Sequence, residues 1–202
     1  MNSLIEQIYG LENLCDINQE IDDDQLHISA ALDNEKPPCP GCSFCDSIFI
    51  GRKIRTLHLP PTGAKKTVLH LSLRRNKCIK CDLTWWPKLS FVNGKQRISK
   101  SFEAYTLDLL RFGTISDVAS HLGVCWDTVK RIHKKFLIKE YKNIDLSEIK
   151  YLSIDEFAIQ KGHKYMTVVS DISTGRIVHA AKGRKAEDIA DFLKSLKKKA
   201  LF

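Results

Sequence analysis

The chain has 202 residues, of which 43% are hydrophobic and 28% are charged, a balance typical of a folded protein with one large or two to three small domains. No stretch approaches the roughly 18 uninterrupted apolar residues that a membrane span needs. The N-terminal segment carries acidic residues where a signal peptide carries basic ones. The composition therefore argues against a membrane or secreted protein and predicts a cytoplasmic one.

Charge is distributed unevenly along the chain. Residues 1–35 contain nine acidic residues and no Lys or Arg, so a charge of −9 there leaves +17 for the rest of a chain whose net charge is +8. The densest basic stretch, Lys36–Lys100, holds fourteen Lys or Arg residues against Asp46 and Asp82. Such a stretch is typical of proteins that neutralise nucleic-acid phosphates. An ordinary basic surface is the alternative, and charge by itself does not separate the two.

The spacing of apolar residues predicts an α+β multidomain protein. It indicates a helix-and-strand lead-in over residues 1–35, a small β module over 36–98, a helical segment over 99–140 and, after a polar linker, an α/β segment over 151–202. The predicted elements, in chain order, are a short helix within Leu4–Leu14, strands at Leu26–Ile28, Ile54–Leu59 and Thr67–Leu73, helices at Ser101–Phe112, Ser116–Leu122 and Trp126–Lys139, strands at Tyr151–Phe157, Lys164–Asp171 and Arg176–Ala181, and a helix at Ala186–Lys199.

Four of the seven cysteines form two CxxC pairs in the β module. Cys39 and Cys42 make one pair, Cys78 and Cys81 make the other, and strand-forming residues lie between them. In a zinc ribbon, two such turns each present two thiolates to one tetrahedral Zn²⁺, and the metal replaces the core that so small a module lacks. The pattern predicts a zinc-ribbon domain in which these four residues bind a structural zinc ion. An odd number of cysteines argues against a disulfide framework.

The other three cysteines leave alternatives open. Cys42 and Cys45 also form a CxxC pair, so spacing alone allows a ligand set that includes Cys45. We favour Cys39, because the proline that follows it suits a tight turn, and this leaves Cys45 as a buried or loop thiol. Cys15 and Cys125 have no partner in the sequence and are expected in the core. A thioredoxin-like redox role for the first pair is disfavoured, because no βαβ pattern surrounds it.

Residues Ser116–Ile132 have the pattern of a helix-turn-helix unit. Ala119 is small where two helices would cross, and Gly123 follows the first helix at a position that needs a left-handed backbone. A plain helical hairpin is the alternative, but it leaves the basic face of the second helix unexplained. The residues expected to share the core of the unit are Val118, Leu122, Val124, Val129 and Ile132.

The second helix of this unit supplies the candidate DNA contacts. In helix-turn-helix proteins that helix enters the major groove, and its first residues approach the base edges. Double-stranded DNA is therefore the predicted partner, and RNA is disfavoured because A-form helices offer no accessible major groove. The candidate base contacts are Trp126, Asp127, Thr128, Lys130 and Arg131, and the candidate phosphate contacts are Lys134 and Lys135.

The order of these features resembles a known family. CPGC, a basic β stretch, CIKC, the segment VCWDTVKRI and the segment IDEFAIQKGHKYMTVVSD follow one another, and over roughly Lys36–Arg184 the chain resembles the ISL3-type insertion-sequence transposases. The resemblance implies a catalytic domain of RNase H-like fold, in which the first acidic residue of a DDE triad lies on the first strand. The IDEFA motif places that residue at Asp155. The resemblance also implies two Mg²⁺ ions held by carboxylates, which activate water and then a 3′-hydroxyl.

The later acidic residues do not fit the remaining positions of that triad. Asp171 ends a predicted strand at a turn, and Glu187, Asp188 and Asp191 lie in the last predicted helix, so capping or solvated roles are expected. The chain ends at Phe202 after three predicted strands and one helix. We therefore expect an incomplete RNase H-like segment with an unpaired sheet edge, which does not catalyse transposition by itself.

These predictions favour a transposase fragment that binds the terminal repeats of its insertion sequence, as a homo-oligomer or with a complementing transposase fragment. The alternative is a DNA-binding regulator that represses transposition by occupying the same ends, without an enzymatic role. A small Mg²⁺-dependent nuclease that uses Asp155 with Asp171 or Asp188 is disfavoured, and so is an RNA-binding zinc-ribbon protein.

Overall fold

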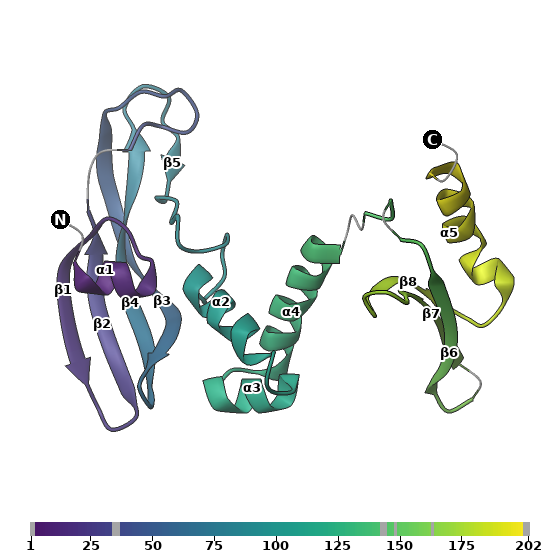
Figure 1. The fold of residues 1–202 in the computed structure, drawn as a ribbon. Coiled ribbons are helices and arrows are strands. Elements are labelled where there is room, and N and C mark those ends of the chain that lie inside the picture. Colours follow the sequence, from purple (N-terminus) through teal and green to yellow (C-terminus); the bar gives the residue numbers. More distant parts are fainter. Residues whose placement is uncertain (1–2, 34–36, 142–144, 148, 163, 200–202) are drawn as a thin grey trace. The chain divides into compact units, whose positions relative to one another are not determined.

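The computed structural model describes residues 3–33, 37–141, 145–147, 149–162 and 164–199. By their internal contacts, the residues divide into two compact units, 1–136 and 137–202, and the ribbon in Figure 1 labels their helices and strands. Among the described residues, no helix has the length and apolar character that crossing a bilayer requires.

The first unit opens with a sheet and a short helix. In the sheet, β4 is central: it pairs parallel with β2 and antiparallel with β3 and β5, and β1 adds an antiparallel edge next to β2 (Figure 1). Residues 1–35, expected as a lead-in, thus supply two strands of the same sheet as the cysteine module. The elements are α1 (Leu4–Tyr9), β1 (Leu14–Ile21), β2 (Gln25–Leu32), β3 (Ser47–Thr62), β4 (Lys65–Cys78) and β5 (Thr84–Trp85).

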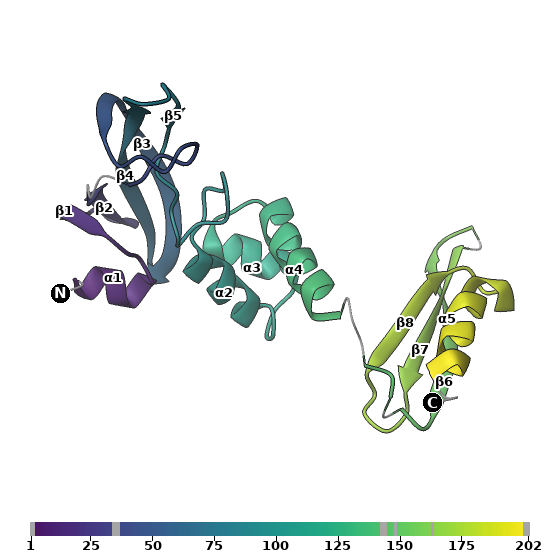
Figure 2. The ribbon, with the colours of Figure 1, turned by 90° about the horizontal axis from the view of Figure 1, so that it is seen from above.

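The predicted strands at Ile54–Leu59 and Thr67–Leu73 are the middle of a much longer β3–β4 hairpin. Alternate side chains of β4, such as Leu69 and Leu71, are fully buried, as expected for a sheet with one face on the core. Tyr9 of α1 joins this core, and Figure 2 shows α1 beside the sheet. This helix is the short helix predicted within Leu4–Leu14, and it ends at the left-handed Gly10 before β1 begins.

Three further helices follow the sheet: α2 (Lys100–Leu109), α3 (Ile115–Leu122) and α4 (Trp126–Tyr141), of which α4 continues past residue 136, where the first unit ends. A backbone bridge joins them to the sheet, because the N–H of His58 in β3 donates to the carbonyl of Arg97 at 2.8 Å and the N–H of Ser99 donates to the carbonyl of His58 at 3.0 Å. Ser99 is also the N-cap of α2, since its hydroxyl accepts from the N–H of Phe102 at 3.0 Å. The N-cap residue of α2 is therefore hydrogen-bonded directly to strand β3.

The second unit is a three-stranded antiparallel sheet with one helix. Its strands lie in the order β6 (Leu152–Gln160), β7 (Lys164–Asp171) and β8 (Ile177–Lys182), followed by α5 (Ala186–Lys199). The rings of His179 in β8 and Phe192 in α5 stack with centroids 4.4 Å apart. Because His179 pairs with the buried Val169, α5 covers the face of the sheet that carries these two residues (Figure 2).

Candidate metal centre and nucleic-acid interface

The two CxxC turns have the same backbone geometry. In each, the N–H of the first cysteine donates to the carbonyl five residues ahead, and the N–H four residues ahead donates back to the carbonyl of the cysteine. These distances are 2.9 and 2.8 Å in the turn that starts at Cys39, and 2.9 and 3.2 Å in the turn that starts at Cys78. The residues four positions ahead, Ser43 and Asp82, have φ values of +58° and +59°. Two repeats of one turn therefore face each other.

Each turn also directs an amide toward a sulfur. The N–H of Gly41 donates to the Sγ of Cys39 at 3.4 Å, and the N–H of Lys80 donates to the Sγ of Cys78 at 3.4 Å. Such hydrogen bonds stabilise a thiolate rather than a thiol. A Cβ at Gly41 would lie 2.9 Å from the Cδ2 of the exposed Leu83, so a larger residue there would require the Leu83 side chain to move.

The β3–β4 hairpin brings the two turns together at one end of the sheet. Ser47 pairs with Cys78 in the ladder, so the turn before β3 and the turn after β4 meet. The Sγ atoms of Cys39 and Cys81 are 3.6 Å apart, and so are those of Cys42 and Cys78. A tetrahedral site with Zn–S bonds of about 2.3 Å has sulfurs about 3.8 Å apart, and all four sulfurs lie within 4.8 Å of one another. The donor set and spacing fit a zinc ion.

The thiols influence one another strongly. Burial opposes ionisation of Cys78, but hydrogen bonds from the backbone N–H groups of Cys81 and Lys80 outweigh it and lower the pKa of the Cys78 thiol to about 7. For Cys81, the N–H of Leu83 favours the thiolate, but the hydrogen bond with Cys42 and burial outweigh it and raise the pKa to about 12. Four thiols this close cannot all ionise without a cation between them.

The remaining cysteines lie outside this group. Cys45 is an exposed loop thiol whose Sγ contacts the carbonyl of Ser43 at 3.9 Å, so the geometry favours the set that starts at Cys39. Cys15 is half-buried at the start of β1. The expectation of a core position is wrong for Cys125, which is exposed. Cys125 comes directly before α4, and its Sγ contacts the hydroxyl of Thr128 at 3.2 Å.

The helix-turn-helix forms where the sequence places it. Thr114 and Asp117 make a capping box at the start of α3, with the Thr114 hydroxyl and N–H donating to Asp117 at 2.6 and 3.0 Å. Gly123 ends α3 with φ +63°, and the N–H of Val124 donates to the carbonyl of Ala119 at 3.1 Å. The chain can therefore turn at once into α4.

The predicted core of this unit is confirmed. Val118, Ala119, Leu122, Val129 and Ile132 are buried in one cluster, and Val124 packs against it half-buried. From the sequence region before the unit, Ile98 and Phe102 join the same cluster. Burial of this apolar face fixes which side of α4 points outward.

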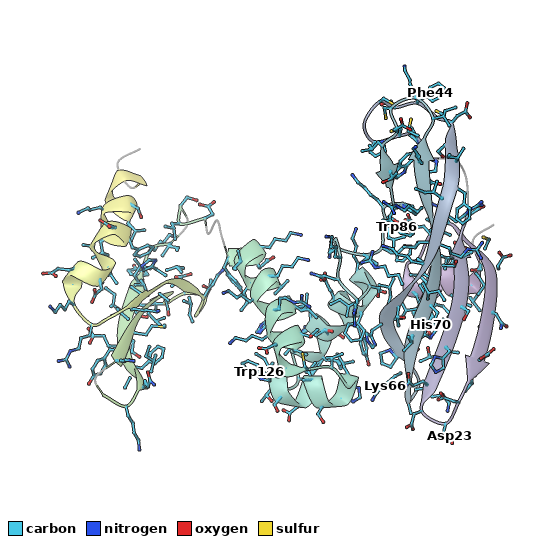
Figure 3. All side chains as sticks on the ribbon, turned by 180° about the vertical axis from the view of Figure 1, so that it is seen from behind. Asp23, Phe44, Lys66, His70, Trp86 and Trp126 are labelled. Atoms are coloured by element: carbon cyan, nitrogen blue, oxygen red, sulfur yellow. The ribbon has the colours of Figure 1, made fainter. Side chains whose placement is uncertain are left out.

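The candidate DNA contacts differ in their exposure and in the contacts that they make within the protein. Asp127, Lys130, Arg131 and Lys134 are exposed and share one face of α4 by their spacing of three and four residues. Trp126, labelled in Figure 3, is 45% exposed and has the Nζ of Lys130 4.6 Å from its ring centroid.

Two other candidates make contacts within the protein. The half-buried Thr128 contacts the sulfur of Cys125, and Lys135 pairs with Glu103 of α2 at 3.3 Å. Of the two predicted phosphate contacts, Lys135 is thus engaged by Glu103, whereas Lys134 is exposed.

Asp155 is an exposed residue of β6, and its Oδ1 accepts a hydrogen bond from the N–H of Glu156 at 2.8 Å. It pairs with Val168, whereas Asp171 pairs with Leu152. Since side chains alternate along a strand, Asp155 and Asp171 point to opposite faces of the sheet. Asp155 lies on the face opposite to α5.

The later acidic residues have structural partners, as expected. Asp171 closes the β7–β8 turn, because its carboxylate accepts from the Thr174 hydroxyl at 2.7 Å and the Ser173 N–H at 3.0 Å, which lower its pKa. Asp188 accepts from the N–H of Lys185 at 2.9 Å before α5. Over the described ranges, the four sulfurs are the single group of three or more potential ligands close enough to share one metal ion.

Comparison with protein families matches two parts of the chain. Residues 87–136 match the helix-turn-helix domain of transposase family ISL3. Residues 152–201 match a second ISL3 family, described as transposase. The first match includes α2, α3 and most of α4, and the second includes the sheet and the helix of the second unit.

Individual relatives agree with these families. The chain is 32% identical over 145 residues to the transposase for insertion sequence element IS1001 of Bordetella parapertussis, which covers 72% of this chain and 35% of the relative. It is 31% identical over 80 residues to the transposase for insertion sequence element IS1557 of Mycobacterium tuberculosis, which covers 39% of this chain and 18% of the relative. The chain thus spans about a third or less of these relatives. No solved structure matches it.

Proposed function

Because this chain belongs to the ISL3 family of insertion-sequence transposases, we propose that it binds duplex DNA at the terminal repeats of its insertion sequence, as the DNA-recognition part of transposition. The observation that carries this proposal is the exposed basic face of α4. Lys130, Arg131 and Lys134 lie on it, on a helix that directly follows a sharp left-handed turn at Gly123. A helix presented in this way fits the major groove of B-DNA.

Within this surface, we assign base reading to Arg131 and phosphate binding to Lys134. A guanidinium makes bidentate hydrogen bonds with guanine, whereas an ammonium further along the helix contacts the backbone as a point charge. Arg131 has no ion pair or hydrogen bond with another described side chain, so its donors are available to DNA.

We propose that the Cys39, Cys42, Cys78 and Cys81 group is a zinc-ribbon site. A bound Zn²⁺ supplies the charge that keeps the four thiolates together, and its role here is structural. The site ties the open end of the β3–β4 hairpin, the same hairpin whose β3 strand holds the start of the helical part through His58. Metal binding therefore supports the surface that reads DNA.

We infer that the second unit begins an RNase H-like catalytic domain in which Asp155 is the first metal-binding carboxylate. The support is the position of Asp155 on the first strand, on the open face away from α5, within the residues that match the transposase family. Mg²⁺ would supply activation of water and of a 3′-hydroxyl there. The contribution of this chain is one exposed carboxylate, held by its hydrogen bond from the Glu156 N–H.

A pair of single substitutions tests the assignment on α4. The probes are a duplex with the terminal repeat of the insertion sequence that encodes the chain and a shuffled duplex of equal composition. Arg131→Gln is expected to reduce the preference for the repeat by about 1–3 kcal/mol. Lys134→Gln is expected to weaken binding to both duplexes equally and to reduce the salt slope by about 1. Equal loss on both duplexes for Arg131→Gln would remove base reading from that residue.

A further inference from the structure

A basic turn before α2 lies next to the DNA-reading helix. The turn, residues 93–97, contains Lys95 and Arg97, both exposed. One hollow of about 480 Å³ is lined by this turn together with Thr128 and Arg131 of α4. A second hollow of about 480 Å³ lies between the same turn and β3, where it is lined by Lys53. The turn therefore continues the basic surface of α4 onto the sheet.

Arg55 of β3 holds the turn in place. Its Nη2 donates to the carbonyl oxygens of Gly94 and Gln96 at 2.9 and 2.7 Å. On the other side, the Asn93 amide donates to Glu103 of α2 at 2.7 Å. The turn is thus held at Asn93, Gly94 and Gln96, while the side chains of Lys95 and Arg97 are exposed.

The charges in this region are unneutralised. Over the part of the chain that the structure describes, no ion pair involves Lys95, Arg97 or Arg131. Burial and the positive charges of Arg97 and Lys66 lower the pKa of His58, which lines the hollow beside α4. Lys66, labelled in Figure 3, also reaches the helix-turn-helix, since a Cβ at Gly123 would lie 2.5 Å from its Nζ. Fixed cations without counter-charges fit a polyanion.

We propose that the turn of residues 93–97 is a second DNA-contacting element, which binds the phosphate backbone beside the groove that α4 enters, and that Arg55 is its positioning residue. The proposal rests on the DNA-binding function proposed above. Lys95 and Arg97 contact phosphates rather than base edges, because they lie on a loop to the side of α4 and not on the helix that enters the groove. In this proposal, the turn held by the sheet and the helix-turn-helix contact the same duplex.

The double variant Lys95→Gln/Arg97→Gln tests the contact in the full chain with its zinc bound. Each phosphate contact contributes about 0.9 to the slope of log affinity against log salt. We expect the slope to fall by about 1.8 and the affinity at 0.1 M salt to fall roughly 10- to 100-fold, equally on terminal-repeat and shuffled duplexes. The matched control, Lys161→Gln/Lys182→Gln, removes two exposed charges from the second unit and is expected to leave the slope unchanged. A double variant whose slope equals the wild-type slope overturns the proposal.

Arg55→Lys tests positioning, because it keeps the positive charge but replaces the guanidinium that reaches both carbonyls. We expect a lower salt slope and weaker binding, with zinc content and circular-dichroism spectrum unchanged. A wild-type slope in this variant removes the positioning role. If the wild-type chain binds neither duplex, the proposed function itself fails. If the wild-type chain binds DNA and the double variant and Arg55→Lys bind as the wild type does, the DNA-binding function stands and only the proposed contact by residues 93–97 is wrong.

Discussion

The Sγ of Cys42 lies 3.6 Å from the Sγ of Cys78, although 36 positions separate the two residues in the sequence. The contact closes the open end of the β3–β4 hairpin. Among the described residues near this end, the large apolar side chains of Ile48 and Ile79 are more than half exposed. In the zinc site that we propose, the metal ion would take the place of a hydrophobic core at this end.

Removing one of these thiolates should release the metal. Structural zinc sites in zinc-finger peptides bind with about 10–16 kcal/mol, and three remaining ligands cannot close the tetrahedron. Cys78→Ser is expected to lose stoichiometric zinc and to lower the unfolding temperature. Cys45→Ser, which alters the exposed thiol next to the site, is expected to keep one zinc per chain. Elemental analysis of both purified variants checks this, and zinc loss from Cys45→Ser would mean that the ligand set is wrong.

Two glycines with the same backbone geometry separate turn strain from DNA binding. Gly10 and Gly123 both end helices in the left-handed region, with φ +61° and +63°. Alanine at either position should cost about 1–2 kcal/mol of stability. A Cβ would meet no atom within 4 Å at Gly10 but would displace Lys66 at Gly123. We therefore expect Gly123→Ala, but not Gly10→Ala, to weaken DNA binding as measured by fluorescence anisotropy. Equal DNA affinities for the two variants would contradict a role of the Gly123 turn in DNA binding.

The capping box of α3 should make stability depend on pH. Hydrogen bonds from the Thr114 hydroxyl and N–H lower the pKa of Asp117 below its ordinary 3.8. A lowered pKa in the folded state means that the box stabilises fully above 3.8, and that this stabilisation is lost as pH falls through the lowered pKa. The stability difference between wild type and Asp117→Asn, measured by urea unfolding, should therefore be present at about pH 6 and shrink toward about pH 2.

Thr114→Ala gives an independent measurement of the same box. It removes the hydroxyl that donates to Asp117 at 2.6 Å and accepts from its N–H, and the loss of an N-cap hydroxyl costs about 1 kcal/mol. The variant is expected to show a weaker acid dependence than wild type. An unchanged acid dependence would mean that another carboxylate sets it.

Two aspartates of the second unit should differ in how much the same substitution destabilises the protein. Asp171→Asn replaces a carboxylate that accepts hydrogen bonds from Ser173 and Thr174 with a neutral amide, which is a weaker acceptor. The unfolding temperature is therefore expected to fall. Asp155→Asn alters an exposed residue whose hydrogen bond is to the N–H of its neighbour, so stability should stay within about 0.5 kcal/mol. Thermal unfolding compares the two. Marked destabilisation by Asp155→Asn would give that residue a structural role instead of the proposed catalytic one.

The sequence alone was sufficient where the signal is local. Spacing of apolar residues and the glycine at position 123 predicted the helix-turn-helix, because burial of one helix face and a left-handed turn each leave a short-range pattern. Each CxxC pair is likewise a local pattern, and the presence of two such pairs predicted the four-cysteine group, although the contact between the pairs is long-range. The strands of the second unit were also located to within a few residues, since β6 begins with alternating apolar and polar residues and β7 and β8 contain β-branched residues.

Long-range features were not predictable in this way. β1 was missed because most of its side chains are exposed and it lacks an alternating apolar pattern. The parallel pairing of β2 with β4 joins Gln25 to Lys66, which no local pattern encodes. Lys95 and Arg97 were counted in the basic stretch, but their place beside α4 depends on the contact from Arg55, 39 and 41 residues away from its two acceptors.

We propose that this chain recognises the terminal repeats of its insertion sequence. The most direct measurement is the affinity of the zinc-bound chain for a terminal-repeat duplex and for a shuffled duplex of the same composition, at several salt concentrations. We expect a preference of about 10³-fold or more for the repeat at physiological salt, and loss of that preference after zinc chelation. Equal affinity for both duplexes, with one salt slope, would contradict it and leave a protein that binds DNA by charge alone.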